Sequence, residues 1–146
     1  MPDKKTIERA KKDKAEGKSA GTQAGEFVRD EIKKVRRGEH GVRNAKQAIA
    51  IGLSQARRAG VDLPPPKTGD AELKKKAKRD TQKGTRHEPV SRKRSRARIK
   101  ALKKEPTTTV SRSELSKQAK RAASKRSKAD RSASARKAAR TRAKNH

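Results

Sequence analysis

Residues 44–60, NAKQAIAIGLSQARRAG, carry the clearest helix pattern in the chain. Asn44 followed three residues later by Gln47 has the pattern of a capping box, which starts a helix by satisfying its first backbone N–H groups. Alanine and aliphatic residues then recur at helical spacing on one side: Ala45, Ala48, Ile49, Leu53 and Ala56. We expect the helix to end at Gly60, with Val61 folded back on the last turn as in a Schellman motif.

A second helix is predicted directly before this one. Thr22 is a favourable N-cap residue, and Gly38 is a favourable terminating residue for a helix that runs to about Arg37. Its apolar residues form one stripe at helical spacing: Ala24, Phe27, Val28, Ile32 and Val35. The link from Gly38 to Arg43 is short, which favours two antiparallel neighbouring helices. The predicted fold class is therefore all-α, built on a helical hairpin.

A weaker helix is predicted from about Lys4 to Glu16, followed by Gly17. Ile7 is its single large apolar residue, so this helix should be mostly solvated. Two helices alone bury little apolar area against the entropy lost on ordering the chain. The module is thus expected to hold two or three helices and to gain stability from the first helix or from a homodimer contact.

Composition limits the rest of the chain. Lys and Arg number 45 against 16 Asp and Glu, which gives a formal net charge of +29 on 146 residues, and hydrophobic residues make up 27%. High net charge with low hydrophobicity predicts disorder over most of such a chain. Cysteine is absent, which excludes disulfides and thiolate chemistry. No apolar run approaches membrane-spanning length and the first residues lack a secretory signal, so an intracellular, cytoplasmic protein is expected.

A change in character falls at the proline run 64–66. The residues before it carry 16 basic and 9 acidic side chains, and those after it carry 29 and 7. Ten large apolar residues lie between Thr22 and Leu63, but only six follow Lys67. Because consecutive prolines cannot continue a helix and favour an extended spacer, we predict a helical module over 1–63, a linker over 64–70 and a basic low-complexity tail over 71–146.

The tail is rich in Lys, Arg, Ala and Ser. Ala, Lys and Arg are strong helix formers, and Ser111 with Glu114 offers a capping box. Like charges would oppose a helix in water. The tail is therefore expected to be largely disordered, with a potential for helix that is realised when phosphates screen the repulsion.

Clusters of Lys and Arg in the tail are the predicted nucleic-acid contacts. They are Lys74, Lys75, Lys76, Lys78, Arg79, Arg92, Lys93, Arg94, Arg96, Arg98, Lys120, Arg121, Lys125, Arg126, Arg136, Lys137, Arg140 and Arg142. Each cation that meets a phosphate releases condensed counterions, which gives affinity without sequence preference. RNA and single-strand readers usually stack bases on aromatic rings. The tail has no Phe, Tyr or Trp, which favours duplex DNA over RNA as the partner.

The helix pair suggests a second mode of contact. A helix-turn-helix reader would place Lys46, Gln47, Arg57 and Arg58 at the groove. The link of six residues exceeds the three or four of a typical helix-turn-helix turn. A packing or dimerisation hairpin with exposed basic residues is therefore favoured.

Catalysis is not expected. The three histidines are isolated in sequence and lack the paired spacing of metal ligands. The serines have no partner acid or base nearby, and the small core would not preorganise a site. The sequence predicts neither an enzyme nor a metal, cofactor, small-molecule or membrane partner.

Two resemblances bear on function. The motif at 46–60, with the segments 4–10, 17–19 and 25–29, resembles an uncharacterised family of small basic bacterial proteins. The tail is similar to bacterial histone H1-like nucleoid proteins, which implies a DNA-coating role and a place on the nucleoid. Two alternatives stay open, an RNA-associated protein of the ribosomal or chaperone kind, and a protein-interaction adaptor whose tail anchors it to a polyanion.

Overall fold

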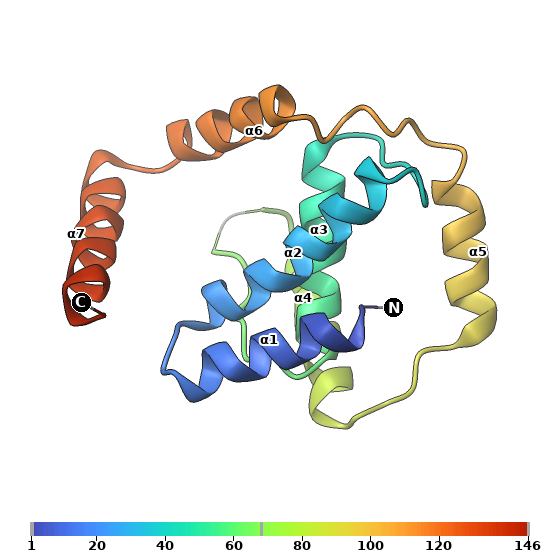
Figure 1. Cartoon of the computed structure of the whole chain (residues 1–146), viewed down its shortest axis with the longest axis horizontal. Coiled ribbons are helices and arrows are strands. Elements are labelled where there is room, and N and C mark those ends of the chain that lie inside the picture. Colours follow the sequence, from blue (N-terminus) through green and yellow to red (C-terminus); the bar gives the residue numbers. More distant parts are fainter. Residues whose placement is uncertain (1, 68, 146) are drawn as a thin grey trace. The chain divides into compact units, whose positions relative to one another are not determined.

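The computed structural model describes residues 2–67 and 69–145, and within these ranges the chain forms seven α-helices (Figure 1). They are α1 (Lys4–Ala15), α2 (Ala20–Arg36), α3 (Ala45–Arg58), α4 (Ala71–Thr85), α5 (Arg92–Leu102), α6 (Arg112–Ser124) and α7 (Lys128–Lys144). Two compact units contain them. The first ends at Ser111 and holds α1 to α5, and the second begins at Arg112 and holds α6 and α7.

The prediction of a short hairpin followed by a disordered tail is wrong. Four of the seven helices lie beyond the proline run, and they account for most of that half of the chain. Three begin at an N-cap whose side chain accepts a hydrogen bond from the third helical residue: Asp70, Ser91 and Ser127. Local capping and the high helix propensity of Ala, Lys and Arg together favour helices in a segment with little apolar area. A low content of apolar residues does not oppose these local effects, because neither of them depends on burial.

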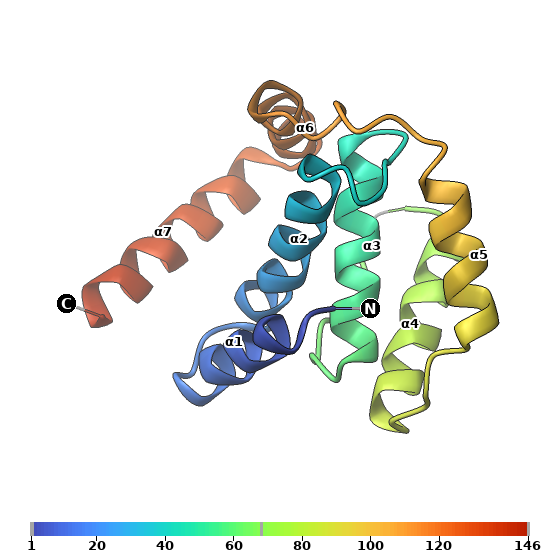
Figure 2. The same ribbon diagram turned by 45° about the vertical axis from the view of Figure 1, so that its right-hand side comes forward.

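The helix α3 lies at the centre of the first unit. It packs against α2 and against α4, and α1 packs against α2 (Figure 2). Two glycines permit these close approaches. A Cβ on Gly52 of α3 would lie 2.6 Å from the Cα of Val28, and a Cβ on Gly84 of α4 would overlap the carbonyl oxygen of Arg57. The predicted pairing of the two central helices is confirmed, and α4 adds a second neighbour that the sequence did not indicate.

The predicted helix ends are largely confirmed. Gly38 and Gly60 have φ values of +76° and +98°, a conformation that glycine adopts without a Cβ penalty. The Val61 N–H donates to the Ala56 carbonyl at 3.0 Å, which completes the expected Schellman motif. The start of α2 is corrected: Ser19 is the N-cap and accepts from the Thr22 N–H, so α2 begins a turn earlier than predicted.

Two apolar clusters form the core of the first unit. The first gathers Phe27, which is 1% exposed, with small residues from three helices and the segment after α3: Ala10, Ala24, Ala56 and Val61. The second joins residues far apart in the sequence: Val35, Val42, Ala48, Leu102 and Val110. The predicted apolar stripes of α2 and α3 thus pack against each other. Residues beyond the proline run complete the second cluster.

The segment 102–110, here called the strap, lies along the link between α2 and α3. The Gly41 N–H donates to the Leu102 carbonyl at 2.9 Å, and the Val42 N–H donates to the Pro106 carbonyl at 3.0 Å. A Cβ on Gly41 would overlap the backbone of Glu105. The link therefore obtains backbone partners from a distant segment of the chain.

Side chains strengthen the same contact. The Thr109 hydroxyl donates to the Val42 carbonyl at 2.8 Å, and Arg36 Nε donates to the Val110 carbonyl at 3.1 Å. Val110 is fully buried. The compact unit thus extends to Ser111, and the independence of residues 1–63 as a module stays a prediction, as does homodimerisation through its helices.

The length and hydropathy of the helices bear on membranes. Among the residues described, no helix is both long enough and apolar enough to cross a bilayer.

Candidate nucleic-acid interface

The outer side of α4 carries the first group of predicted contacts. Ala77, Asp80 and Gly84 are buried on its inner side. The cations project from the remaining surface, where all but the half-buried Lys74 are exposed: Lys74, Lys75, Lys76, Lys78 and Arg79. The 3.6-residue period of the helix separates the two groups, so packing against α3 leaves the basic face of α4 in solvent.

Within the first unit, α5 packs through one narrow face. Leu102 is buried, and Ser95 and Ile99 are half-buried. Every cation on the helix is exposed: Arg92, Lys93, Arg94, Arg96, Arg98 and Lys100. In the part of the chain that the structure describes, none of these six side chains forms an ion pair or a hydrogen bond. The helix therefore presents uncompensated positive charge around most of its circumference.

In the second unit, α6 separates charge from small apolar residues. Lys120 and Arg121 are exposed and share a side with Lys117, which pairs with Glu114 at 3.2 Å. The opposite side carries Leu115 and three alanines. Helical spacing alone produces this division, and it leaves the basic side of α6 accessible.

Between α6 and α7, Lys125 and Arg126 are both exposed. The Arg126 guanidinium donates to the Asp130 carbonyl at 3.1 Å and to the Ser134 hydroxyl. Arg126 thus stays at the surface but uses part of its donor set on the first turns of α7.

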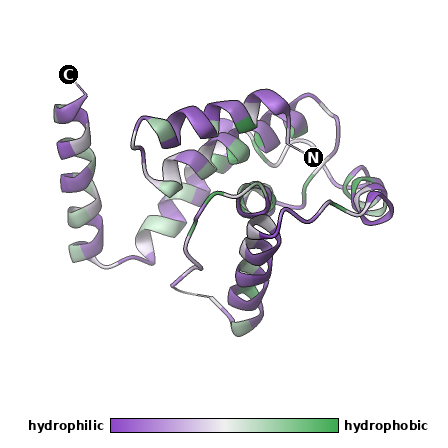
Figure 3. Cartoon of the chain, turned by 90° about the horizontal axis from the view of Figure 1, so that it is seen from below, coloured by the Kyte–Doolittle hydropathy of each residue, from purple (hydrophilic) through white to green (hydrophobic). Residues whose placement is uncertain are grey.

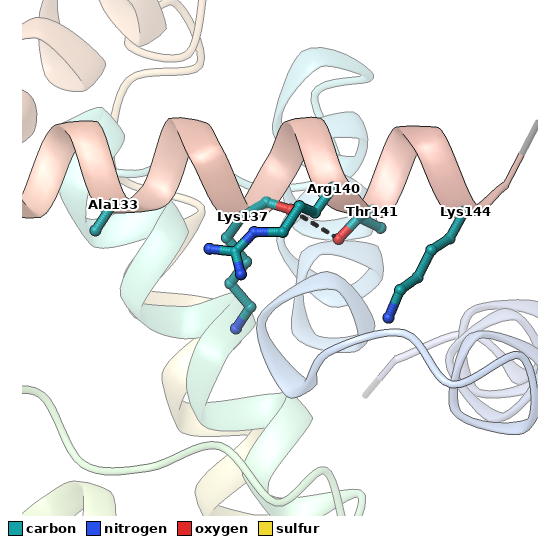
Figure 4. Close-up of a pocket in the computed structure, with 5 residues that line it drawn as sticks. All are labelled: Ala133, Lys137, Arg140, Thr141 and Lys144. Atoms are coloured by element: carbon teal, nitrogen blue, oxygen red, sulfur yellow. Dashed lines mark hydrogen bonds between the residues drawn. The ribbon is translucent and has the colours of Figure 1, made fainter.

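The last helix, α7, is exposed along its whole length and contains no buried residue. Strongly hydrophilic positions alternate along it with weakly hydrophobic ones (Figure 3). One face forms an open pocket lined by Ala133, Lys137, Arg140, Thr141 and Lys144 (Figure 4). The Thr141 hydroxyl turns back to its own helix and donates to the Lys137 carbonyl at 3.0 Å. Cations therefore dominate what this face offers to a partner.

The four residues proposed for the helix pair have different surroundings. Lys46 is exposed at the start of α3. Gln47 caps the helix, because its side-chain oxygen accepts from the Arg43 N–H at 2.6 Å while its own N–H donates to Asn44 at 2.8 Å. Of this pair of residues, only Lys46 is exposed and forms no ion pair or side-chain hydrogen bond within the described chain.

Arg57 and Arg58 are engaged inside the first unit. The buried Arg57 donates to the Pro64 carbonyl at 3.0 Å, and burial lowers the pKa of its guanidinium against an opposing effect of nearby Asp80. Arg58 pairs with Asp80 at 2.9 Å, and Asp80 also accepts from the Ser54 hydroxyl at 2.7 Å. These two arginines hold α3 to the segment that follows it and to α4.

The charge balance around α1 and α2 differs from that of the later helices. Arg9 pairs with Glu26 at 2.7 Å and Lys34 with Asp30 at 3.2 Å. Lys18 lies 2.8 Å from Asp13, and this hydrogen bond, with one to Glu16, raises the pKa of Lys18 above its usual value. Carboxylates thus compensate many cations in this region, which distinguishes it from the exposed faces of α4, α5 and α7.

The clusters of Lys and Arg identified in the sequence left out several exposed cations. Lys100, Lys128, Arg131 and Lys144 are also exposed cations on the same helices. A helical projection of α5 would have placed Lys100 opposite the packed face, and α7 buries no residue, so every cation on it was a candidate.

A buried polar group was missed as well. His40 Nε2 lies 2.8 Å from Glu31 Oε1, both side chains are almost fully buried, and Gln55 donates to the other Glu31 oxygen at 3.3 Å. Glu31 follows Phe27 by four residues on the packed side of α2, which was the available signal. No group of three or more His, Cys, Asp or Glu suited to a metal ion occurs among the described residues.

Comparison with known proteins concerns the first part of the chain. Residues 8–67 match a family model described as "Family of unknown function (DUF6496)". No curated protein and no solved structure matches the chain. The match agrees with the resemblance of this part to an uncharacterised family, while the likeness of the tail to histone H1-like proteins stays a prediction. The basic helices α4 to α7 lie outside the matched stretch.

Proposed function

We propose that the protein is a non-enzymatic, sequence-independent nucleic-acid-binding protein that coats duplex DNA by neutralising its phosphates, in the manner of nucleoid-associated histone H1-like proteins. The observation that carries the proposal is the outward, uncompensated positive charge on the helices after the proline run. The exposed cations of α5, without an ion pair in the described structure, are the strongest instance. The proposed location, the cytoplasmic nucleoid, follows from the proposed partner.

Distributed charge of this kind supports a particular mode of binding. Each neutralised phosphate releases condensed counterions, so affinity falls steeply with salt and does not depend on base sequence. Contacts to phosphate position a protein without reading bases. We therefore expect no single arginine to dominate binding, because the cations are spread over four helices.

The choice of duplex DNA rests on the aromatic inventory. Proteins that bind single strands or RNA loops stack bases on aromatic rings. Phe27 is the only Phe, Trp or Tyr of the chain, and it is 1% exposed in the first apolar cluster. No such ring is thus available for base stacking, and the phosphate backbone of a duplex is the favoured target.

The test is a titration of duplex DNA with the full chain across a salt series. One variant carries Arg92→Gln, Arg94→Gln, Arg96→Gln and Arg98→Gln. A matched control removes four charges from α1, with Lys4→Gln, Lys5→Gln, Lys11→Gln and Lys12→Gln. All eight side chains are exposed, so both variants should keep the fold.

We expect steep salt dependence for the unaltered chain. The slope of log K against log salt should become shallower by about 0.9 for each phosphate contact that the α5 variant loses. The α1 control should change less, because carboxylates such as Glu16, 3.9 Å from Lys12, already reduce the local potential. Absence of binding at low salt would overturn the proposal. Tighter binding of structured RNA than of duplex DNA at equal salt would show that RNA, and not DNA, is the preferred partner.

A further inference from the structure

The helix α7 combines a high density of positive charge with a complete lack of buried residues. Seven cations lie on this helix against one carboxylate, Asp130, in its first turn. The helix buries nothing, so no face is reserved for packing within the described chain. The whole circumference of α7 is therefore available to a partner.

A ridge of small residues runs along one side of α7. Ser132, Ala135, Ala139 and Ala143 follow one another at spacings of three or four residues, which places them in one row on a helix. All four are exposed. Because these side chains are short, the backbone of α7 can approach a partner closely along the ridge.

Cations border the ridge on both sides. Arg136, Arg140 and Lys144 form a row at spacings of four residues on one side, and Arg140 and Lys144 line the open face seen in Figure 4. Arg131 and Arg142 lie on the other side of the ridge, at positions three or four residues from its members. A partner that meets the ridge would thus find long cationic side chains reaching out to both of its flanks.

We propose that α7 binds in the major groove of B-form duplex DNA, with the ridge toward the groove floor and the two cationic rows on the phosphates of the two strands. The inference rests on the proposed function and names the mode of contact. An α-helix with side chains is about 10–12 Å across, and the major groove of B-DNA is about 12 Å wide. Phosphate rows border this groove on both sides, which is the charge complement of two cationic rows separated by small residues.

The same geometry disfavours double-stranded RNA. The major groove of an A-form helix is deep and narrow, so side chains cannot read it as they read the groove of B-DNA. A helix with cations on two sides could then engage only one phosphate row of RNA at a time. We therefore expect the full chain to prefer DNA over RNA duplexes of equal length and sequence, with α7 as the source of the preference.

The test uses dimethyl sulfate, which methylates guanine N7 in the major groove, on duplex DNA bound to the full chain. Ala135→Pro places a proline in the middle of α7, where it removes a helical N–H and breaks the helix. Ala129→Pro is the matched control, because proline is tolerated in the first helical turn, and Ala129 is the second residue of α7. Neither substitution changes the charge, and circular dichroism reports the helix content of each variant.

We expect the unaltered chain and Ala129→Pro to protect guanine N7, and Ala135→Pro to lose the protection together with the preference for DNA over RNA. Unprotected N7 in a complex that still forms with steep salt dependence would overturn the groove placement and leave the proposed function standing. Unchanged protection in a helix-broken Ala135→Pro variant would overturn the assignment to α7. Absence of binding to any duplex at low salt would overturn both proposals.

Discussion

At the scale of single residues, small side chains decide where helices meet. Gly52 lets α3 approach the backbone of Val28 so closely that a Cβ would lie 2.6 Å from its Cα. Gly25 of α2, by contrast, has no heavy atom within 4 Å of an added Cβ. Helix packing therefore requires glycine at position 52. Within the described structure, it does not require glycine at position 25.

This contrast predicts opposite effects of one substitution. Gly52→Ala should destabilise the fold by about 1–3 kcal/mol, because overpacking forces helices apart. Gly25→Ala should stabilise it by about 0.5–1 kcal/mol, since alanine loses less conformational entropy in a helix. Urea unfolding followed by circular dichroism measures both. Equal effects of the two changes would contradict the close approach of α2 and α3.

The buried pair of Glu31 and His40 gives a second prediction at this scale. His40→Ala would leave the Glu31 carboxylate, 2% exposed, with Gln55 as its remaining polar contact. Leaving a buried polar group without a hydrogen-bond partner costs about 1–3 kcal/mol. Gln82→Ala is the control, because Gln82 is exposed on α4. A loss of stability no greater than the control's, in thermal unfolding, would show that the pair does not hold the link between α2 and α3.

At the scale of elements, the strap links the basic half of the chain to the core. Leu102 and Val110 complete the second apolar cluster, and backbone hydrogen bonds join the strap to Gly41 and Val42. The cations of α5 lie directly before the strap. The strap therefore anchors the exposed basic helix to the folded unit.

Two leucine substitutions test this anchoring. Leu102→Ala should destabilise the first unit by about 2–5 kcal/mol, the usual effect of truncating a buried leucine. Leu73→Ala, at a site that is 44% exposed, should have a much smaller effect. Denaturant unfolding of the full chain compares the two. Similar midpoints for both variants would mean that the strap does not contribute to the core.

At the scale of the whole molecule, net charge opposes compactness. A formal charge of +29 on 146 residues repels itself wherever it is not compensated. Screening shortens the range of this repulsion from about 30 Å at 0.01 M salt to about 10 Å at 0.1 M. A bound polyanion would relieve the same repulsion and add binding free energy to the folded state.

Thermal unfolding should report both effects. Without DNA, Tm is expected to rise between low and moderate salt as repulsion is screened. At low salt, two duplexes of unrelated sequence should raise Tm equally, and the rise should shrink as salt weakens binding. A Tm increase confined to one of the two sequences would contradict sequence-independent binding.

Much of the local structure could be predicted from particular residues. Asn44, Gly38 and Gly60 marked helix ends that the structure confirms, because caps and left-handed turns depend on a few adjacent side chains. The helices after Pro66 were assigned to disorder, although Asp70, Ser91 and Ser127 were readable as caps. Hydrophobic composition indicates how much area can be buried, and local capping is independent of that quantity.

The candidate interface likewise has a part that local sequence could predict and a part that it could not. The exposed cations of α5 and α7 were predicted from their clusters, because charge at high density has to face solvent. The inward positions of Arg57 and Arg58 were not, since their partners Pro64 and Asp80 come from segments whose contact depends on the α3–α4 packing. The place of the bound nucleic acid stays a prediction.

The net charge follows from composition, and the apolar stripes, helix caps and cation clusters follow from residues within a few positions of one another. Three features needed the three-dimensional contacts: α4 packs on α3, Leu102 and Val110 close the core beside Val42, and Arg57 and Arg58 are engaged within the first unit. The physical reason is that these contacts join segments up to about seventy residues apart. Their formation depends on shape complementarity at sites such as Gly52 and Gly84, which no local pattern reveals.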